Sequence, residues 1–172
     1  LSSRRQRQMC IRDRIEYGGQ NRSVFIDMPA ALSYPMNLKK YNWGYRAEPE
    51  PNLYGRSLIC PRGKGLGGSS SINGMIYVRG HPQDFDNWST KGASSWSFAD
   101  VLPYFKKMEC CESRQSAWRG KNGPIRIKTA EQKNVLHKVF SDAAIQCGYS
   151  FTEDYNGYKQ EGIGAAEMTV YK

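Results

Sequence analysis

The sequence predicts a mixed, loop-rich α/β fold. Three segments carry helix-start signals, near residues 82, 97 and 134, and residues 123–129 alternate apolar and basic side chains as a strand does. The 17 glycines and 8 prolines place much of the 172-residue chain outside these segments. This length allows one ordinary domain with a core, and no apolar run approaches the roughly 20 residues of a membrane-spanning helix.

The first third of the chain is expected to contain little regular structure. Residues 15–19 (IEYGG) are predicted to form a strand end followed by a glycine turn. Over residues 20–60, prolines recur among apolar and aromatic side chains and exclude a long helix: Pro29, Pro35, Pro49 and Pro51.

Two consecutive helices are predicted in the middle of the chain. Pro82 is suited to the first turn of a short helix. Ser97, followed by Asp100 three residues later, resembles a capping box with Asp in place of the usual Glu or Gln. This pair predicts the start of a helix over residues 98–107, whose regularity Pro103 limits.

A strand and a helix are predicted in the last third. Residues 123–129 (GPIRIKT) have the alternation of an exposed strand. Asn134 can cap a helix that Gly148 ends. The apolar residues of this helix share one face: Val135, Val139, Phe140, Ala143 and Cys147.

The segment over residues 61–80 is rich in glycine and serine and contains Gly-x-Gly-x-x-Gly over residues 63–68. A dinucleotide-binding turn should follow a buried strand directly, but Pro61 and Arg62 intervene. A P-loop needs Lys and then Ser or Thr directly after its last glycine, whereas Gly68 is followed by Ser69. The segment can still cradle a phosphorylated cofactor. Its clustered glycines let the backbone approach a ligand, its serines can cap a following helix, and Arg62 and Lys64 add positive charge. The alternative is a flexible surface linker, which the apolar continuation over residues 72–78 disfavours.

The net charge of +9 does not indicate a nucleic-acid partner. The chain carries 25 Lys+Arg against 16 Asp+Glu. Residues 1–14 hold five arginines against one aspartate, a net charge of +4, and the remaining excess is spread as on an ordinary solvated surface.

The five cysteines predict neither a disulfide framework nor a metal site. Their number is odd, no Cys-x-x-Cys occurs, and the chain has only two histidines. We expect free thiols in a reducing compartment. The positions are Cys10, Cys60, Cys110, Cys111 and Cys147.

Several motifs follow one another along residues 15–172. After IEYGG come the glycine–serine segment PRGKGLGGSSSINGMIYVRG and then DFDNW, WSFADVLPYFKK, GKNGPI and DYNGYKQEGIG. In their order and spacing they resemble the N-terminal part of the glucose–methanol–choline (GMC) flavin oxidoreductases. Two further stretches, MPAAL and YNWGY, resemble the subgroup of that family that oxidises choline.

The resemblance implies a partial FAD/NAD(P)-binding Rossmann-like domain that lacks its first βα unit, with FAD as the cofactor. It implies oxidation of an alcohol by hydride transfer to the flavin, with choline to betaine aldehyde as the expected reaction. Its partners would be a small-molecule alcohol and an electron acceptor. The full-length enzyme would be intracellular, either cytoplasmic or peripherally associated with an inner membrane, and mitochondrial in a eukaryote.

The resemblance also assigns cofactor-binding residues. Glu16 would accept hydrogen bonds from the ribose hydroxyls of the adenosine, as a carboxylate at a strand end can. Asn73 would lie near the isoalloxazine, although its side chain could instead brace its own loop. The pyrophosphate and flavin side would be lined by Gly65, Gly67, Gly68, Ser69 and Ser70, and Gly74, Met75 and Ile76 would pass close to the ring with Asn73.

No catalytic residue is expected within the chain. The family's catalytic histidine lies near the C-terminal end of a longer protein, and neither His81 nor His137 matches its motif. We expect His81 to be a surface or hinge residue and His137 to be partly buried on a helix. The chain alone is therefore expected to be inactive and to bind FAD weakly.

The resemblance divides the chain into two parts. Residues 15–172 are expected to be a fragment of a GMC N-terminal FAD-binding domain. Residues 1–14 are expected to be a leader foreign to the family, because their five arginines cannot form the buried parallel strand that should precede Ile15.

Two other functions remain open. One is a basic nucleic-acid- or membrane-surface-binding module built on the arginines of residues 1–14, which predicts salt-sensitive binding. The other is a non-catalytic GMC-like protein.

Overall fold

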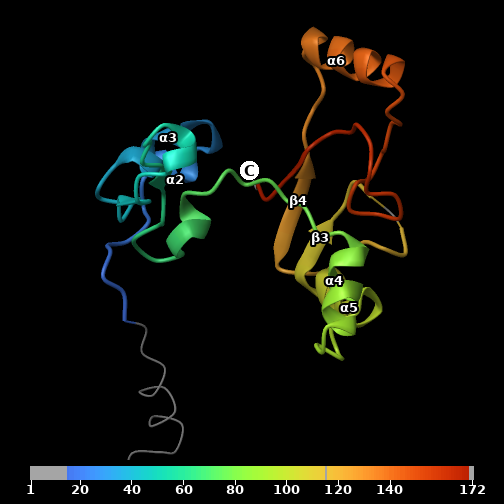
Figure 1. Cartoon of the computed structure of the whole chain (residues 1–172), viewed down its shortest axis with the longest axis horizontal. Helices are drawn as coiled ribbons and strands as arrows, with labels where there is room; N and C mark the ends of the chain where they lie inside the picture. The colour runs from blue at the N-terminus through green and yellow to red at the C-terminus, as the bar shows by residue number, and fades with distance from the viewer. Residues whose placement is uncertain (1–14, 115, 171–172) are drawn as a thin grey trace, which may run out of the picture. The chain divides into compact units, whose positions relative to one another are not determined.

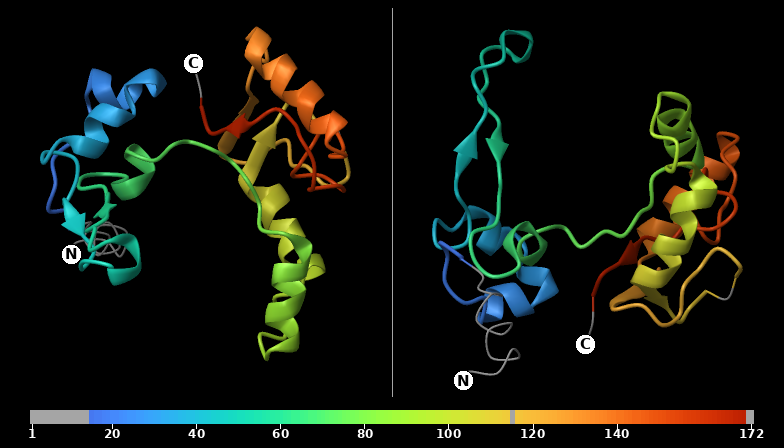
Figure 2. Two further views of the ribbon diagram at one scale, coloured as in Figure 1. Left: turned by 45° about the horizontal axis from the view of Figure 1, so that its top comes forward. Right: turned by 90° about the horizontal axis from the view of Figure 1, so that it is seen from below.

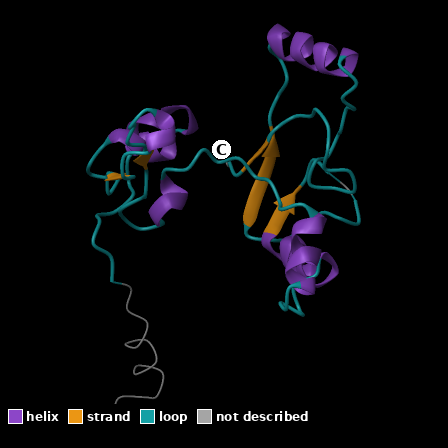
Figure 3. Cartoon of the chain, viewed as in Figure 1, coloured by secondary structure: helices purple, strands orange, loops and turns teal. Residues whose placement is uncertain are grey.

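The computed structural model describes residues 15–114 and 116–170 and divides the chain into two compact units that meet in sequence at Gly74 and Met75. Figures 1 and 2 show the chain from three directions, and Figure 3 colours its helices and strands. The expectation of a foreign leader over residues 1–14 concerns residues outside those described. The mixed, loop-rich α/β fold is confirmed.

The first unit consists of short helical turns joined by loops. Its helices are α2 (Val24–Asp27) and α3 (Ser33–Asn37), with the 3-10 turns η1 (Pro29–Ala31), η2 (Pro51–Leu53) and η3 (Gly68–Ser71). No described helix in this unit exceeds five residues, as the prolines predict.

One two-stranded sheet crosses the first unit. Strand β1 (Tyr45–Arg46) pairs antiparallel with β2 (Ile59–Cys60), and the two form an extended ribbon in the right-hand view of Figure 2. The buried Asn42 braces the base of this ribbon: its Oδ1 accepts from the backbone N–H groups of Gly44 and Arg62 at 3.1 and 3.0 Å. The ribbon therefore carries the chain back to the start of the glycine–serine segment.

The second unit is built on a three-stranded sheet with the order β3–β4–β5. Strand β3 (Glu109–Cys111) runs parallel to β4 (Ile125–Thr129), and β5 (Glu167–Met168) pairs antiparallel with β4. The expected strand over residues 123–129 is confirmed as the central strand of this sheet, and its basic side chains Arg126 and Lys128 are exposed, as the alternation predicts. Its Ile127 packs with Tyr77 and Cys111 in the core of the unit.

Helices α4 (Pro82–Thr90) and α5 (Phe98–Met108) precede the sheet, and α5 leads directly into β3 (Figure 1). Both helices begin with the predicted signals. Pro82 lies in the first turn of α4, and the Ser97–Asp100 capping box at α5 is complete. The Phe85 ring joins the two helices, since it packs edge-to-face on Phe105 with centroids 5.6 Å apart.

Helix α6 (Val135–Gln146) begins at the predicted cap, where Asn134 Oδ1 accepts from Leu136 N at 2.9 Å. Gly148 follows it with a φ of +90°, as a helix-ending glycine does. None of the residues of α6 is buried. Its apolar face is instead largely exposed, with Val135 at 71%, Val139 at 58% and Phe140 at 65%.

Two local expectations are wrong. Residues 15–19 bend at Tyr17 and Gly18 as expected but form no strand, because no described segment pairs with them. The serines after Gly68 do not cap a regular helix; they lie in the single turn η3. The four cysteines in the described ranges are free thiols, and none of the helices described there is both long and apolar enough to cross a bilayer.

Candidate functional site

The carboxylate of Glu16 holds the glycine–serine segment in place. Its Oε1 accepts hydrogen bonds from the backbone N–H groups of Gly18 and Gly65, each at 2.9 Å, and the second of these spans 49 residues of sequence. Glu16 is half-buried. A carboxylate can accept about four hydrogen bonds, so these two leave it further acceptor capacity.

The segment packs so closely that side chains are excluded at several positions. A Cβ on Gly18 would lie 2.3 Å from the nitrogen of Gly65, and a Cβ on Gly63 would lie 2.1 Å from the carbonyl oxygen of Gly68. Gly65 is buried and has a φ of +131°, which L-residues rarely adopt. The glycine pattern therefore serves close backbone packing as well as access to a ligand.

The serine hydroxyls stabilise the turn that follows. Ser69 Oγ accepts from Gly63 N at 3.1 Å, and Ser70 Oγ donates to Gly67 O at 2.6 Å. Gly67, Ser69 and Ser70 are exposed, and Gly68 is half-buried. The exposed backbone and hydroxyls of this turn can be approached by a polar ligand.

The positive charge of Lys64 lies among aromatic rings. Its Nζ is 5.7 Å from the centroid of Tyr17 and 5.6 Å from that of Trp43, and the two rings are 4.9 Å apart. Cation–π contacts of this kind orient an ammonium group. These contacts hold the ammonium group of Lys64 beside Tyr17, the residue that follows Glu16.

The four residues expected near the isoalloxazine fall on both sides of the boundary between the units. Asn73 and Gly74 end the first unit, and both are exposed. Met75 and Ile76 begin the second unit. Met75 has a φ of +60°, its carbonyl accepts from the N–H of Thr169 at 2.8 Å, and Ile76 is 59% exposed.

A buried cluster of charges follows in the second unit, and sequence reasoning missed it. Arg119 lies at its centre and is 3% exposed. Its guanidinium donates to Glu109 at 2.9 Å, to Asp154 at 2.6 Å and to Glu167 at 2.8 Å. Arg79 adds a second cation, 2.8 Å from Glu109. Both Arg79 and Asp154 lie in motifs quoted above, but their pairing depends on the fold.

The cluster shifts the pKa values of its members. Burial by itself would raise the pKa of Glu109, but hydrogen bonds from Arg119 and from the N–H of Gly120, with the charge of Arg79, outweigh burial and lower it. Burial would likewise lower the pKa of Arg119, but Glu167 and Glu109 raise it. Both groups are held in their charged forms.

The two histidines lie on helices, His81 at the start of α4 and His137 within α6. Nδ1 of His81 accepts from the N–H of Gln83 at 3.2 Å, and His81 N donates to Asp84 at 3.1 Å, so His81 is the N-cap of α4. It is exposed, as expected of a surface residue. His137 is half-buried on α6, which confirms the expectation for that residue.

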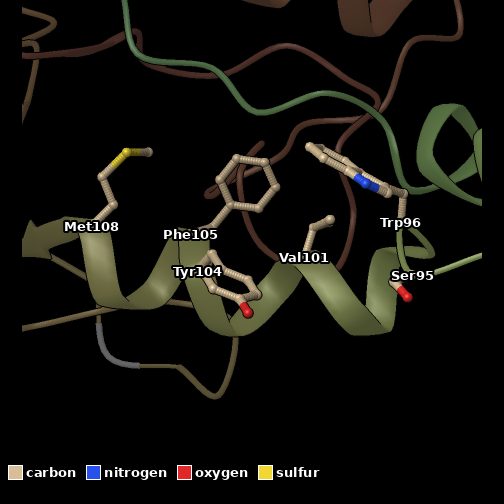
Figure 4. A pocket seen from close by; sticks show the side chains of 6 residues that line it. All are labelled: Ser95, Trp96, Val101, Tyr104, Phe105 and Met108. Atoms are coloured by element: carbon tan, nitrogen blue, oxygen red, sulfur yellow. The ribbon is translucent and has the colours of Figure 1, made fainter. Parts of the chain in front are cut away.

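An apolar hollow of about 430 Å³ lies along α5 (Figure 4). Val101, Phe105 and Met108 project from the helix, and Trp96 faces them from the preceding loop. Ser95 and Tyr104 complete the lining. None of the predicted cofactor-binding residues lines this hollow, and it contains no charged group that could orient a cofactor.

Known proteins similar to the chain were identified by sequence and by structure. The family model "GMC oxidoreductase" matches residues 13–171. An oxygen-dependent choline dehydrogenase of Brucella melitensis is 55% identical over 157 residues, which are 91% of this chain and 29% of that protein. The chain thus spans less than a third of the length of this relative.

Solved structures agree with the family match. The crystal structure of pyridoxine 4-oxidase from Mesorbium loti superposes with a TM-score of 0.84 at 29% identity, over 91% of this chain and 31% of that one. A FAD-dependent oxidoreductase from Chaetomium thermophilum gives 0.81 at 26% identity, over 91% and 28%. These likenesses support the expected partial Rossmann-like FAD-binding domain. GMC oxidoreductases are FAD flavoproteins, and the family match over nearly the whole sequence shows that this chain belongs to the GMC oxidoreductase family.

Proposed function

We propose that the chain is part of a FAD-dependent enzyme that oxidises the CH–OH group of a small alcohol, with choline as the substrate. The observation that carries the proposal is the anchoring of the glycine–serine segment by Glu16, whose Oε1 binds the N–H groups of Gly18 and Gly65. Choline is favoured because the relative at 55% identity is an oxygen-dependent choline dehydrogenase.

The residues present fit the adenosine and pyrophosphate parts of FAD. The anchored carboxylate of Glu16 retains the capacity to accept hydrogen bonds from ribose hydroxyls. Gly67, Ser69 and Ser70 expose backbone and hydroxyl groups that can face the phosphates without obstruction by larger side chains. The place that a Cβ would fill at Gly63 is occupied by the segment's own backbone, and the place at Gly65 is occupied by Asn21 and Gly19, so glycine is needed at both positions.

When bound, FAD accepts the hydride of the alcohol. The residues of this chain would contribute binding and orientation. Glu16 would fix the adenosine end, and Ser69 and Ser70 would contribute hydroxyls on the pyrophosphate side. We propose no proton-transfer role for His81, since its Nδ1 already accepts the N–H of Gln83 as a helix cap.

The test uses the full-length enzyme that contains this chain, beside the chain alone. We expect the enzyme to purify with FAD and to oxidise choline, and the chain alone to be inactive and to lose FAD during gel filtration. The chain would supply only part of the cofactor's contacts to offset the cost of association. Full-length protein without flavin would overturn the proposal. If the chain instead bound RNA or anionic vesicles in a salt-sensitive way that needs residues 1–14, the basic-module alternative would be supported.

A further inference from the structure

The dipeptide Asn-Gly occurs three times in the chain, at Asn73–Gly74, Asn122–Gly123 and Asn156–Gly157. This dipeptide is chemically labile, because the backbone nitrogen of the glycine can attack the side-chain amide of the asparagine and no glycine side chain hinders the approach. The attack requires a glycine N–H that is not held in a hydrogen bond and a backbone that is free to bend. The fold places the three copies in different surroundings, so their reactivities should differ.

The Asn73–Gly74 step meets both requirements. Asn73 and Gly74 are exposed and lie outside the helices and strands, at the end of the first unit. Among the described residues, none accepts a hydrogen bond from the N–H of Gly74. No atom lies within 4 Å of the place that a Cβ on Gly74 would take. The nucleophilic nitrogen is therefore available, and the backbone around it has room to bend.

The Asn122–Gly123 step has an exposed asparagine but a restrained glycine. The N–H of Gly123 donates to Glu109 O at 2.9 Å. A Cβ on Gly123 would lie 2.3 Å from the carbonyl carbon of Met108, so the backbone here packs tightly against the junction of α5 and β3. This part of the second unit must open locally before the nitrogen can attack.

The Asn156–Gly157 step is restrained on both sides of the reaction. The asparagine is 4% exposed, its Nδ2 donates to Glu167 Oε2 at 2.8 Å, and its Oδ1 accepts from Arg79 N at 2.7 Å. The glycine N–H donates to Asp154 O at 3.0 Å. Neither the amide nor the nitrogen can move toward the other while these bonds hold.

We propose that Asn73 is a site of spontaneous covalent modification, at which the chain converts to aspartate and isoaspartate while the fold protects Asn122 and Asn156. In the first step Gly74 N forms a bond to Cγ of Asn73, the bond from Cγ to Nδ2 breaks, and ammonia leaves with the proton of the Gly74 N–H. A five-membered succinimide ring results. This inference does not depend on the proposed function.

In the second step a solvent water molecule adds to one of the two ring carbonyls and reopens the ring. Opening on one side gives aspartate, and opening on the other gives isoaspartate, in which the former side-chain carbonyl continues the backbone. Neither step oxidises or reduces any atom. Both products place a carboxylate where the neutral amide stood, and isoaspartate also lengthens the backbone by one carbon atom at the last step before the second unit begins.

The test is peptide mapping of the whole 172-residue chain by mass spectrometry during incubation at mildly alkaline pH, which favours loss of the amide proton. The three steps are then compared within one sample. We expect Asn73 to be lost at least about tenfold faster than Asn122 or Asn156, because only those two steps require local opening. In concentrated urea the three rates should converge, because the fold no longer protects any of them.

Gly74→Ala tests the site directly. Nothing lies within 4 Å of the new Cβ and the φ of Gly74 is outside the left-handed region, so folding should be preserved. The methyl group hinders the attack, and the loss of Asn73 should slow at least about tenfold. Gly19→Ala, which also meets no atom within 4 Å, is the control and should leave the rate unchanged. Equal rates at the three steps in the native chain, or a rate at Asn73 that Gly74→Ala does not change, would overturn the inference.

Discussion

Arg119 and Glu167 form a two-pronged ion pair in the interior of the second unit. Nη1 donates to Oε1 at 3.0 Å and Nη2 donates to Oε2 at 2.8 Å. The side chains are 0% and 2% exposed, so water does not screen the pair. Breaking such a pair leaves a buried charge without a partner, and this cost exceeds the value of the pair itself.

Arg119→Met should therefore destabilise the chain strongly. It leaves Glu109 and Glu167 without their central cation, and we expect a loss of about 3–5 kcal/mol in the free energy of unfolding. Urea denaturation followed by fluorescence measures it. The matched control is Lys138→Ala, which removes the exposed pair of Lys138 with Asp142 on α6 and should cost less than about 1 kcal/mol. Equal losses in the two variants would contradict the assignment of stability to the cluster.

The lowered pKa of Glu109 predicts a stability that depends on acid pH. The ordinary pKa of this carboxyl is 4.5, and its folded value lies below that. Since the unfolded chain takes up the proton first, the contribution of Glu109 is fully present above pH 4.5 and is lost as the pH falls through the folded pKa. Urea midpoints measured from pH 7 to pH 3 should show this decline. Glu109→Gln should lower the urea midpoint at pH 7 and should weaken the dependence of the midpoint on pH. A pH dependence equal to that of the wild type would refute the role of Glu109.

Gly63→Ala should disturb the glycine–serine segment. The new Cβ would meet the carbonyl of Gly68 at 2.1 Å, so the backbone must shift, at a cost of about 1–3 kcal/mol. Gly19→Ala is the control, because nothing lies within 4 Å of its Cβ, and it should change stability by no more than about 0.5 kcal/mol. Thermal unfolding of both variants compares them directly. Similar melting temperatures would show that the segment tolerates side chains at this point.

Glu16→Ala should affect both the segment and the cofactor. It removes the acceptor for the N–H groups of Gly18 and Gly65, and we expect a loss of about 1–2 kcal/mol. In the full-length enzyme it should also lower the FAD content at least tenfold after dialysis. Glu50→Ala removes an exposed carboxylate that accepts a single backbone N–H from Asn52, and it should leave the FAD content unchanged. Full FAD retention in Glu16→Ala would contradict the proposed ribose contact.

Local signals in the sequence predicted local structure well. The capping pair Ser97 and Asp100 and the cap Asn134 act within one helical turn, and both helices begin where these residues place them. Strand β3 was not predicted, because three residues carry too little pattern and its pairing with β4 is decided by the fold. The expected strand at residues 15–19 is absent because a strand needs a pairing partner, and none of the described segments pairs with these residues.

In the candidate site too, the sequence identified local motifs but not the contacts between residues far apart in the chain. The glycines were identified from their spacing, but the bond from Gly65 to Glu16 crosses 49 positions and could not be seen in that spacing. Arg79 and Asn156 each belong to a quoted motif, and only the folded chain brings them within 2.7 Å. Motif order therefore identified the participating segments, while the contacts between them required the structure.

The open face of α6 has a practical consequence for work on the isolated chain. Val135, Leu136 and Phe140 expose an apolar surface to water along this helix. Purified alone, the chain should self-associate as its concentration rises and should be retained by hydrophobic-interaction resin. Light scattering over a dilution series would set the concentration below which measurements on the chain report a monomer.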